Sequence, residues 1–194
     1  MILYIVGDDN MPIWLIVVLV VLLLIVLFII ANYNSLVRLR NKVRDQFSQI
    51  DVQLKKRSDL VPNLVETVKG YTKHESETLE NIVNARNKYL SAKNENDKVN
   101  ASNEMSDSLT KLFALAESYP ELKANTNFEN LQNQLQEVEE KISYARQFYN
   151  DTVLMYNNKV EVFPSNIIAS MFGFKKDVFF EAKEEERENV KVKF

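Results

Sequence analysis

A long apolar run near the N-terminus limits what this chain can fold into more than any other feature. No formal charge occurs from Asn10 to Val37, a stretch of 28 residues, and its apolar centre, Ile13–Ala31, is 19 residues long. A helix of that length rises by about 28 Å, which is close to the thickness of the hydrocarbon core of a bilayer. The run therefore predicts a transmembrane helix over residues 11–31, preceded by a short tail at 1–10.

The charges on either side of the run predict its orientation. Asp8 and Asp9 precede it, and the first charges after it are all basic: Arg38, Arg40, Lys42 and Arg44. Basic residues that flank a membrane helix stay on the cytoplasmic side. We therefore expect a single-pass protein of the cell membrane with its N-terminus outside and everything after the helix in the cytoplasm. The basic cluster sets this topology, and in a second interpretation it also holds anionic lipid.

Two other interpretations of the run are disfavoured. A signal peptide begins with basic residues, has a shorter apolar core and ends at a cleavage site made of small residues. Here the start is acidic, the core is long and Ala31 is followed by Asn32 and Tyr33. A buried helix of a soluble domain normally keeps a polar stripe, and Ile13–Ala31 has none.

The composition of the rest of the chain excludes several function classes. The part after the run carries a net charge of −1, so it lacks the basic face that nucleic-acid binding requires. The chain has no cysteine, and its single histidine is His74. A zinc site or a di-iron site with two Glu-x-x-His motifs would need more ligands than these. We therefore expect no catalysis, no metal site and no cofactor.

Apolar residues spaced three and four apart predict four amphipathic helices in residues 32–164. The expected helices are Tyr33–Lys69, Tyr71–Lys93, Glu104–Ser118 and Phe128–Phe163. The asparagine-rich stretch 94–103 is expected to be a connection, and 121–127 a loop. Pro62 is expected to kink the first helix near Ser58. The predicted fold is all-α: a transmembrane helix continuous with a long antiparallel four-helix bundle resembling a coiled coil.

Polar residues occur inside or beside the apolar seams of these helices. Seven-residue spacing relates Tyr149 to Tyr156 and Asn150 to Asn157, so each pair shares a helix face. Our hypothesis is an internal network that joins two arginines to two carboxylates. Its members are Arg86, Arg146, Glu66 and Glu139. The alternative is that these four are flanking surface charges.

Residues 165–194 form a C-terminal tail of three parts. The first is rich in apolar side chains, among them Ile167, Ile168, Met171, Phe172, Phe174, Phe179 and Phe180. These residues either cap the open end of the bundle or form a patch that lies in the membrane interface or binds a partner. The second part, Glu181–Glu188, is densely charged, and the third, Val190–Phe194, alternates like a short strand.

Several sequence blocks resemble the LemA family. The most specific are Tyr33–Asn41 and Gln49–Tyr71, followed in order by Ala116–Pro120, Phe163–Pro164 and Phe172–Phe174. The likeness extends over about residues 12 to 180, although Phe47 stands where Trp is expected. The resemblance implies a bacterial single-pass membrane protein with a helical-bundle body and no established reaction. One relative takes part in magnetosome-membrane formation, which favours a role in membrane organisation.

Together these features favour a non-enzymatic scaffold or interaction module at the cytoplasmic membrane face. Its expected partners are the lipid bilayer and at least one unidentified protein, with a homo-oligomer as a further expectation and no nucleic acid. The alternative is a bundle that senses a ligand or signal and is coupled to its transmembrane helix. A dry cavity of ligand size lined by the polar seam residues would favour sensing, and a solid core would favour scaffolding.

Overall fold

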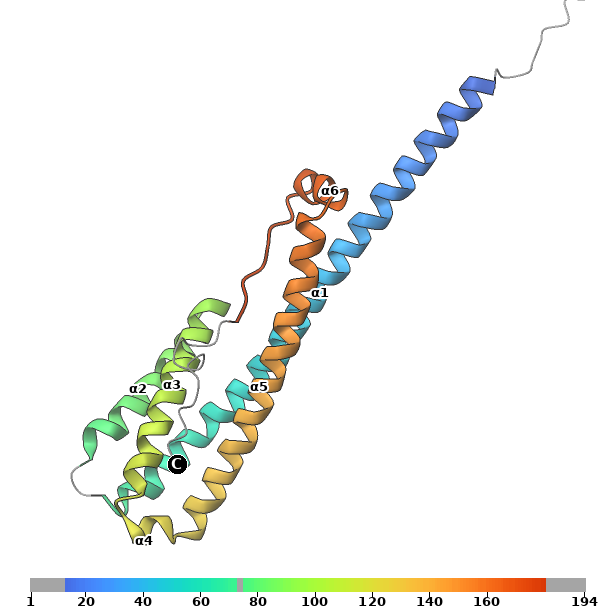
Figure 1. The fold of residues 1–194 in the computed structure, drawn as a ribbon. Coiled ribbons are helices and arrows are strands. Elements are labelled where there is room, and N and C mark those ends of the chain that lie inside the picture. Colours follow the sequence, from blue (N-terminus) through green and yellow to red (C-terminus); the bar gives the residue numbers. More distant parts are fainter. Residues whose placement is uncertain (1–12, 73–74, 181–194) are drawn as a thin grey trace, which may run out of the picture. The chain divides into compact units, whose positions relative to one another are not determined.

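The computed structural model describes residues 13–72 and 75–180, and every regular element in these ranges is a helix (Figure 1). The helices are α1 Ile13–Lys69, α2 Ser76–Ser91, α3 Glu95–Ala116, α4 Pro120–Lys123, α5 Thr126–Glu161 and α6 Ser165–Met171. The all-α prediction is confirmed. The tail at 1–10, His74 and the predicted charged and strand-like parts of the C-terminus at 181–194 lie outside the described residues.

The chain divides into two compact units, which are described separately. The anchor unit comprises the described residues of Met1–Lys42 together with Leu154–Asp177. The bundle unit comprises residues 43–153, of which residues 73–74 are not described, and residues 178–180. Both α1 and α5 contribute residues to each unit.

In the bundle unit, α1 and α5 run in opposite directions. Near the start of the unit the rings of Phe47 and Tyr149 lie 5.8 Å apart. Ten residues further along α1, Arg57 bonds to Glu139, which lies ten residues earlier on α5. A step forward along α1 therefore corresponds to an equal step backward along α5, as an antiparallel bundle requires.

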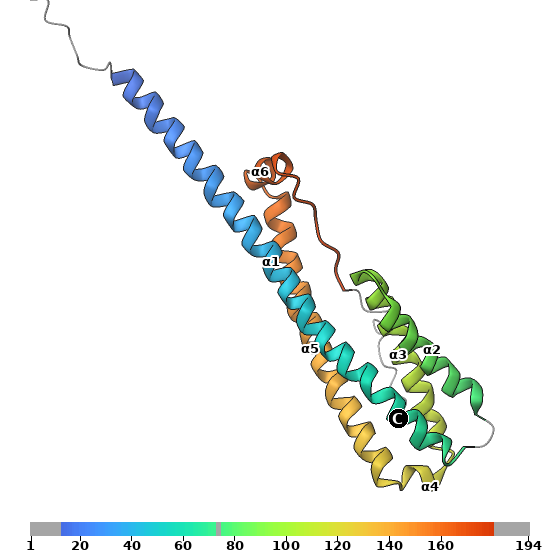
Figure 2. The same ribbon diagram turned by 180° about the vertical axis from the view of Figure 1, so that it is seen from behind.

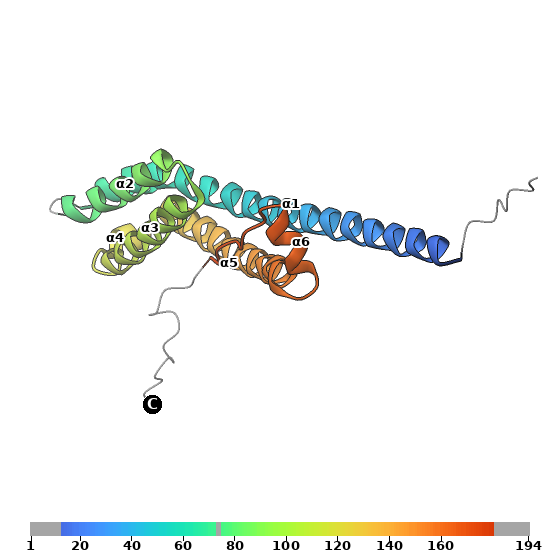
Figure 3. The same ribbon diagram turned by 90° about the horizontal axis from the view of Figure 1, so that it is seen from above.

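The other helices of the bundle unit follow the same alternation. Tyr89 of α2 bonds to Asp51 of α1, and Arg86 of α2 bonds to Ser58 of α1, so these two helices are also antiparallel. Helices α2 and α3 lie side by side (Figures 2 and 3). The bundle unit is thus the predicted antiparallel arrangement of four helices.

The apolar seam of α1 is buried along almost its whole length after the membrane-length run. Its buried members in the bundle unit are Val43, Phe47, Ile50, Leu54, Val61, Leu64, Val65 and Val68. Matching side chains from α3 and α5 are fully enclosed, including Met105, Leu112, Val138 and Ile142. Burial of such side chains stabilises the folded chain by about 1.5–3 kcal/mol each relative to exposure.

The structure corrects the predicted start of the third helix. Stretch 94–103 is not a connection, because α3 begins at Glu95. Asn94 is its N-cap: its side-chain oxygen accepts the N–H of Asp97 at 2.8 Å, and its amide donates to the Asp97 carboxylate at 2.7 Å. Asparagine favours helix starts as well as loops, so composition alone gave the wrong assignment.

The predicted loop at 121–127 is also only partly irregular. Pro120 occupies the first turn of α4, where its missing N–H costs no hydrogen bond. After α4, the side-chain oxygen of Asn125 accepts the N–H groups of Asn127 and Phe128 at 2.9 and 3.0 Å. This cap starts α5 at Thr126.

α1 continues through Pro62 to Lys69. Because proline has no N–H, the carbonyl of Ser58 loses its partner within the helix. The Nε of Arg86 on α2 donates to this carbonyl at 2.9 Å and replaces the missing bond. Ser58 is fully buried, so an unpaired carbonyl at this position would be costly.

The first part of α1 is long and apolar enough to cross a membrane, judged by length and composition. None of its most apolar window is buried within the structure. Asn32, which follows the apolar run, donates its amide to the carbonyl of Phe28 at 2.9 Å. The first polar side chain after the run is therefore satisfied by its own helix.

Candidate functional site

Arg57 is the centre of the polar interior of the bundle unit. Its side chain is fully buried, yet it lies on α1 among the apolar seam residues. One guanidinium nitrogen donates to the hydroxyl of Ser106 at 2.7 Å and to the Glu139 carboxylate at 2.8 Å. The other donates to the hydroxyl of Ser102 at 2.7 Å and to its carbonyl at 2.9 Å. One cation therefore joins α1, α3 and α5.

The four residues of the predicted network have different partners in the structure. Glu139 is the carboxylate of the Arg57 pair, and its side chain is 46% exposed. Arg86 donates a hydrogen bond to the Ser58 carbonyl. Glu66 is 74% exposed and pairs with Lys69 one turn further along α1, so it lies on the surface.

Arg146 is held between a polar and an aromatic partner. One of its terminal nitrogens donates to the side-chain oxygen of Asn103 at 2.8 Å. Its guanidinium carbon also lies 4.1 Å from the centroid of the Phe180 ring, in a cation–π contact. This arginine therefore joins α5 to α3 and to the segment after α6.

Sequence reasoning left Arg57 out of the network, although the signal was present. The apolar seam of α1 skips one position between Leu54 and Val61, and Arg57 occupies it. A charged residue at a seam position is rarely buried unless it is paired. The four bonds to Ser102, Ser106 and Glu139 pair both terminal nitrogens of the guanidinium, whereas its buried Nε has no hydrogen-bond partner within the described residues.

A second polar group in the bundle unit surrounds Asp51. The Tyr89 hydroxyl donates to one oxygen of its carboxylate at 2.9 Å, and Lys98 pairs with the other at 2.7 Å. Burial of the hydroxyl, and then its bond to Asp51, raise the pKa of Tyr89 above its usual value. The tyrosine is therefore held in its neutral form as a structural donor.

Tyr149 and Asn150 of α5 hold the C-terminal segment of the bundle unit. The Tyr149 hydroxyl donates to the carbonyl of Val178 at 2.9 Å. The Asn150 amide donates to the carbonyl of Phe180 at 3.0 Å, and its oxygen accepts the Phe180 N–H at 2.8 Å. One asparagine thus satisfies both backbone groups of one extended residue.

The same dipeptide recurs seven residues later, in the anchor unit. The Tyr156 hydroxyl donates to the carbonyl of Lys175 at 2.9 Å. The Asn157 amide donates to the carbonyl of Asp177 at 2.9 Å, and its oxygen accepts the Asp177 N–H at 2.8 Å. We call these two dipeptides, Tyr149–Asn150 and Tyr156–Asn157, the Tyr-Asn clamps.

α6 lies next to the part of α1 that directly follows the apolar run. α6 ends at Met171, and the turn after it includes Gly173, whose φ of 70° suits glycine. The N–H of Gly173 donates to the carbonyl of Ser170, and the N–H of Phe174 donates to the carbonyl of Ala169. The Phe172 and Phe174 rings then lie 4.8 and 5.8 Å from that of Tyr33.

The predicted C-terminal patch separates into buried and exposed members. Ile168, Phe174 and Phe180 are buried, and so they contribute to the cores of their units. The exposed members are Ile167, Met171, Phe172 and Phe179. The segment therefore packs against its unit through one set of apolar side chains and exposes another set to solvent.

The basic cluster after the apolar run is mostly exposed. Arg38, Lys42 and Arg44 face solvent, whereas Arg40 is half-buried with its guanidinium carbon 5.0 Å from the centroid of the Phe174 ring. Three of the four predicted basic residues are therefore available to an outside partner.

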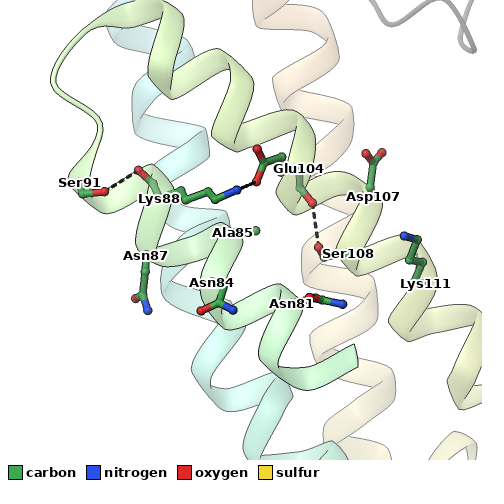
Figure 4. Close-up of a pocket in the computed structure, with 10 residues that line it drawn as sticks. All are labelled: Asn81, Asn84, Ala85, Asn87, Lys88, Ser91, Glu104, Asp107, Ser108 and Lys111. Carbon is green, nitrogen blue, oxygen red and sulfur yellow. Dashed lines mark hydrogen bonds and ion pairs between the residues drawn. The ribbon is translucent and has the colours of Figure 1, made fainter. Parts of the chain in front are cut away.

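Surface grooves on the bundle unit lie between pairs of helices. A polar groove of about 780 Å³ lies between α2 and α3, and the ion pair of Lys88 with Glu104 spans it (Figure 4). A second groove, of about 390 Å³, lies between α3 and α5 and includes Ser106 and Glu139 of the Arg57 network. Within the described ranges, no group of three or more His, Cys, Asp or Glu residues could hold a metal ion.

Comparison with known proteins decides the family. The sequence profile of the LemA family matches residues 46–194. The chain belongs to the LemA family. The profile includes every residue of the Arg57 network and both Tyr-Asn clamps, whereas the apolar run and the basic cluster precede its first residue.

Individual relatives agree with this assignment. Protein LemA of Metamycoplasma hominis is 25% identical over 162 residues, which is 83% of this chain and 74% of that protein. The similarity to magnetosome proteins is shorter. Magnetosome protein MamQ 2 of Paramagnetospirillum magneticum is 30% identical over 77 residues, 40% of this chain and 28% of that protein. MamQ of Magnetospirillum gryphiswaldense is 26% identical over the same number of residues. This LemA-family chain thus spans only about a quarter of the MamQ proteins.

Proposed function

We propose that this chain is a non-enzymatic scaffold, anchored in the membrane by α1, that holds a protein partner at the cytoplasmic face. In this proposal the N-terminus lies outside and the bundle unit lies in the cytoplasm. The exposed basic residues Arg38, Lys42 and Arg44 support that orientation, because they immediately follow the apolar run.

The polar interior of the bundle unit supports a structural role for its ionisable groups. The fully buried Arg57 directs its four hydrogen bonds at two serines and one glutamate of the same unit. Arg86 likewise bonds to a backbone carbonyl. Groups committed to holding helices together are well suited to a rigid binding surface and poorly suited to proton transfer.

The observation that carries the partner proposal is a pair of exposed aromatic residues on α5. Tyr144 and Phe148 are 65% and 61% exposed and lie one helical turn apart. Large aromatic side chains are enriched where proteins bind one another, because they bury much area at low entropic cost. A partner protein that covers this face of α5 would bury both rings.

Site-specific photo-crosslinking in intact cells tests this proposal. A photoreactive amino acid would replace Tyr144 or Phe148, and a matched control would place it at the exposed Asn87 of α2. We expect one protein to crosslink from both α5 positions and not from the control. Equal crosslinking from all three positions, or none from α5, would refute the scaffold assignment.

The groove beside Glu139 favours sensing as a second candidate function. A ligand in this groove would contact Ser106 and Glu139 and so could alter the Arg57 network. The double variant Arg57→Met with Glu139→Leu separates the two functions. If the chain is a scaffold, this variant, once shown to be folded, should still crosslink the partner from Phe148. If the chain is a sensor, the same variant should lose the cellular response that the ligand triggers.

A further inference from the structure

The end of α5 and α6 expose an unusual amount of apolar surface in the anchor unit. The exposed fractions are 75% for Phe163, 53% for Ile167, 64% for Met171 and 49% for Phe172. We call these four residues the α6 patch. No formal charge occurs from Val162 to Phe174. Contiguous exposed apolar side chains of this size usually mark a binding surface.

The anchor unit itself indicates what covers the α6 patch. Phe172 lies against Tyr33, with their ring centroids 4.8 Å apart. Tyr33 is the second residue after Ala31, where the apolar run of α1 ends. At a rise of about 1.5 Å per residue, Tyr33 lies about 3 Å beyond the end of that run. The patch is therefore held at the level where α1 would leave the hydrocarbon core.

The side chains around the patch also suit a membrane surface. Tyrosine, as at Tyr33, is typical of the boundary between hydrocarbon and water, and phenylalanine, as at Phe172, is typical of the apolar face of helices that lie in this boundary. The exposed Lys175 and Lys176 directly follow the uncharged stretch, Glu161 directly precedes it and pairs with Lys176 at 2.6 Å, and Arg38 lies five residues after Tyr33 on α1. Apolar side chains with basic ones such as Lys175 and Arg38 nearby match a leaflet that contains anionic lipid.

The patch is fixed in place, which a membrane-docking element requires. Ile168 and Ala169 on the inner side of α6 are buried. After the turn at Gly173, the second Tyr-Asn clamp holds Lys175 and Asp177 against α5. Since both ends of α6 are tied to α5, its exposed side chains keep one orientation without a partner.

We propose that the α6 patch inserts into the interfacial layer of the leaflet from which α1 emerges, as a second membrane contact of this chain. The occupant is phospholipid, with Ile167 and Met171 at the level of the upper acyl chains and Lys175 among anionic headgroups. This inference rests on the proposed function, because it requires that α1 spans the membrane.

Single-cysteine labelling of the full-length chain tests the depth of the patch. The sequence contains no cysteine, so each variant carries one unique label. Met171→Cys and Ile167→Cys probe the patch, and the exposed Asn158→Cys on α5 is the matched control in the same unit. Leu22→Cys in the middle of the apolar run reports whether α1 spans the bilayer. Each variant would be labelled with an environment-sensitive fluorophore and reconstituted in vesicles of mixed neutral and anionic phospholipid.

Quenchers attached to lipids at two depths give the readout. We expect a shallow quencher, placed at the level of the upper acyl chains, to act at least about threefold more strongly on both patch labels than on the Asn158 label, and the deep quencher to act on Leu22 alone. Patch labels quenched no more than the Asn158 label, with Leu22 quenched at depth, would overturn the second contact while leaving the anchor intact. An unquenched Leu22 label would overturn the anchor and this inference together.

Discussion

Replacing Arg57 by alanine should strongly destabilise the bundle unit. The side chain is fully buried and makes four hydrogen bonds to three residues on two other helices. Hydrogen bonds to a charged group contribute about 1.5–3 kcal/mol each, and deleting a large buried side chain leaves a cavity as well. Part of this loss is recovered because Glu139 is 46% exposed and can be hydrated again. We expect a net loss of about 3–5 kcal/mol.

Thermal unfolding of the full-length chain in detergent micelles, followed by far-UV circular dichroism, measures this loss. For a chain of this size, 1 kcal/mol corresponds to about 2–4 °C in Tm, so Arg57→Ala should lower Tm by about 6–20 °C. Arg57→Met keeps most of the volume and removes the charge. It should cost less than Arg57→Ala but more than about 1 kcal/mol, because two serine hydroxyls lose a partner.

Variants of the carboxylate separate pairing from packing. Glu139→Gln should cost only about 1–2 kcal/mol, because water reaches this side chain. The double variant Arg57→Met with Glu139→Leu should cost less than the sum of its single changes, since it removes both charges at once. Glu137→Gln on the same helix is the matched control. The exposed pair of Glu137 with Lys141 lowers the pKa of that carboxyl, and its loss should leave Tm unchanged.

Two results would contradict this reasoning. If Arg57→Ala unfolds within about 2 °C of the wild type, the guanidinium does not hold the three helices together. If Arg57→Ala is unstable but Arg57→Met matches the wild type, the effect comes from side-chain volume, and the hydrogen bonds to Ser102, Ser106 and Glu139 are dispensable.

Two further predictions concern other buried polar groups of the bundle unit. The folded chain keeps Tyr89 protonated above the usual tyrosine pKa of about 10, whereas the unfolded chain ionises there, so stability should fall as pH rises past about 10. Tm measured between about pH 8 and 11 should show a smaller fall for Tyr89→Phe than for the wild type, and parallel curves would contradict the assignment. Pro62→Ala returns an N–H to the Ser58 carbonyl, so Arg86→Leu should cost about 1 kcal/mol less in that background than in the wild type. Equal costs in both backgrounds would show that the Arg86 bond does not compensate for the proline.

The helices could be predicted because their apolar spacing agrees with how they pack. Apart from the seven-residue step over Arg57, intervals of three and four predict the seam from Val43 to Val68, and the antiparallel order follows from short connections. The start of α3 could not be predicted in the same way. Asparagine serves both loops and N-caps, and only the bond between Asn94 and Asp97 shows which role applies.

The polar interior was predictable in kind but not in pairing. Helical periodicity identifies which residues share a face, and so it placed Arg86, Arg146 and Glu139 near the seams. It does not give the vertical register between helices, which decides whether a carboxylate faces Arg57 or Arg86. Burial of Arg57 was missed for a further reason, since arginine is seldom buried and only the surrounding serines and Glu139 reveal that its terminal nitrogens are paired here.

The Tyr-Asn clamps explain how an extended segment comes to lie against α5 without a β-sheet. An extended chain must satisfy its backbone N–H and carbonyl groups, and a neighbouring strand normally does so. Here the side chains of Asn150 and Asn157 each supply one donor and one acceptor to a single residue. Seven residues of helix rise by about 10.5 Å, and three residues of extended chain cover about 10 Å. A dipeptide repeated every seven residues on α5 therefore meets the segment every three residues, at Asp177 and then at Phe180. The heptad repeat thus specifies both the apolar seam of α5 and the path of the chain that leaves α6.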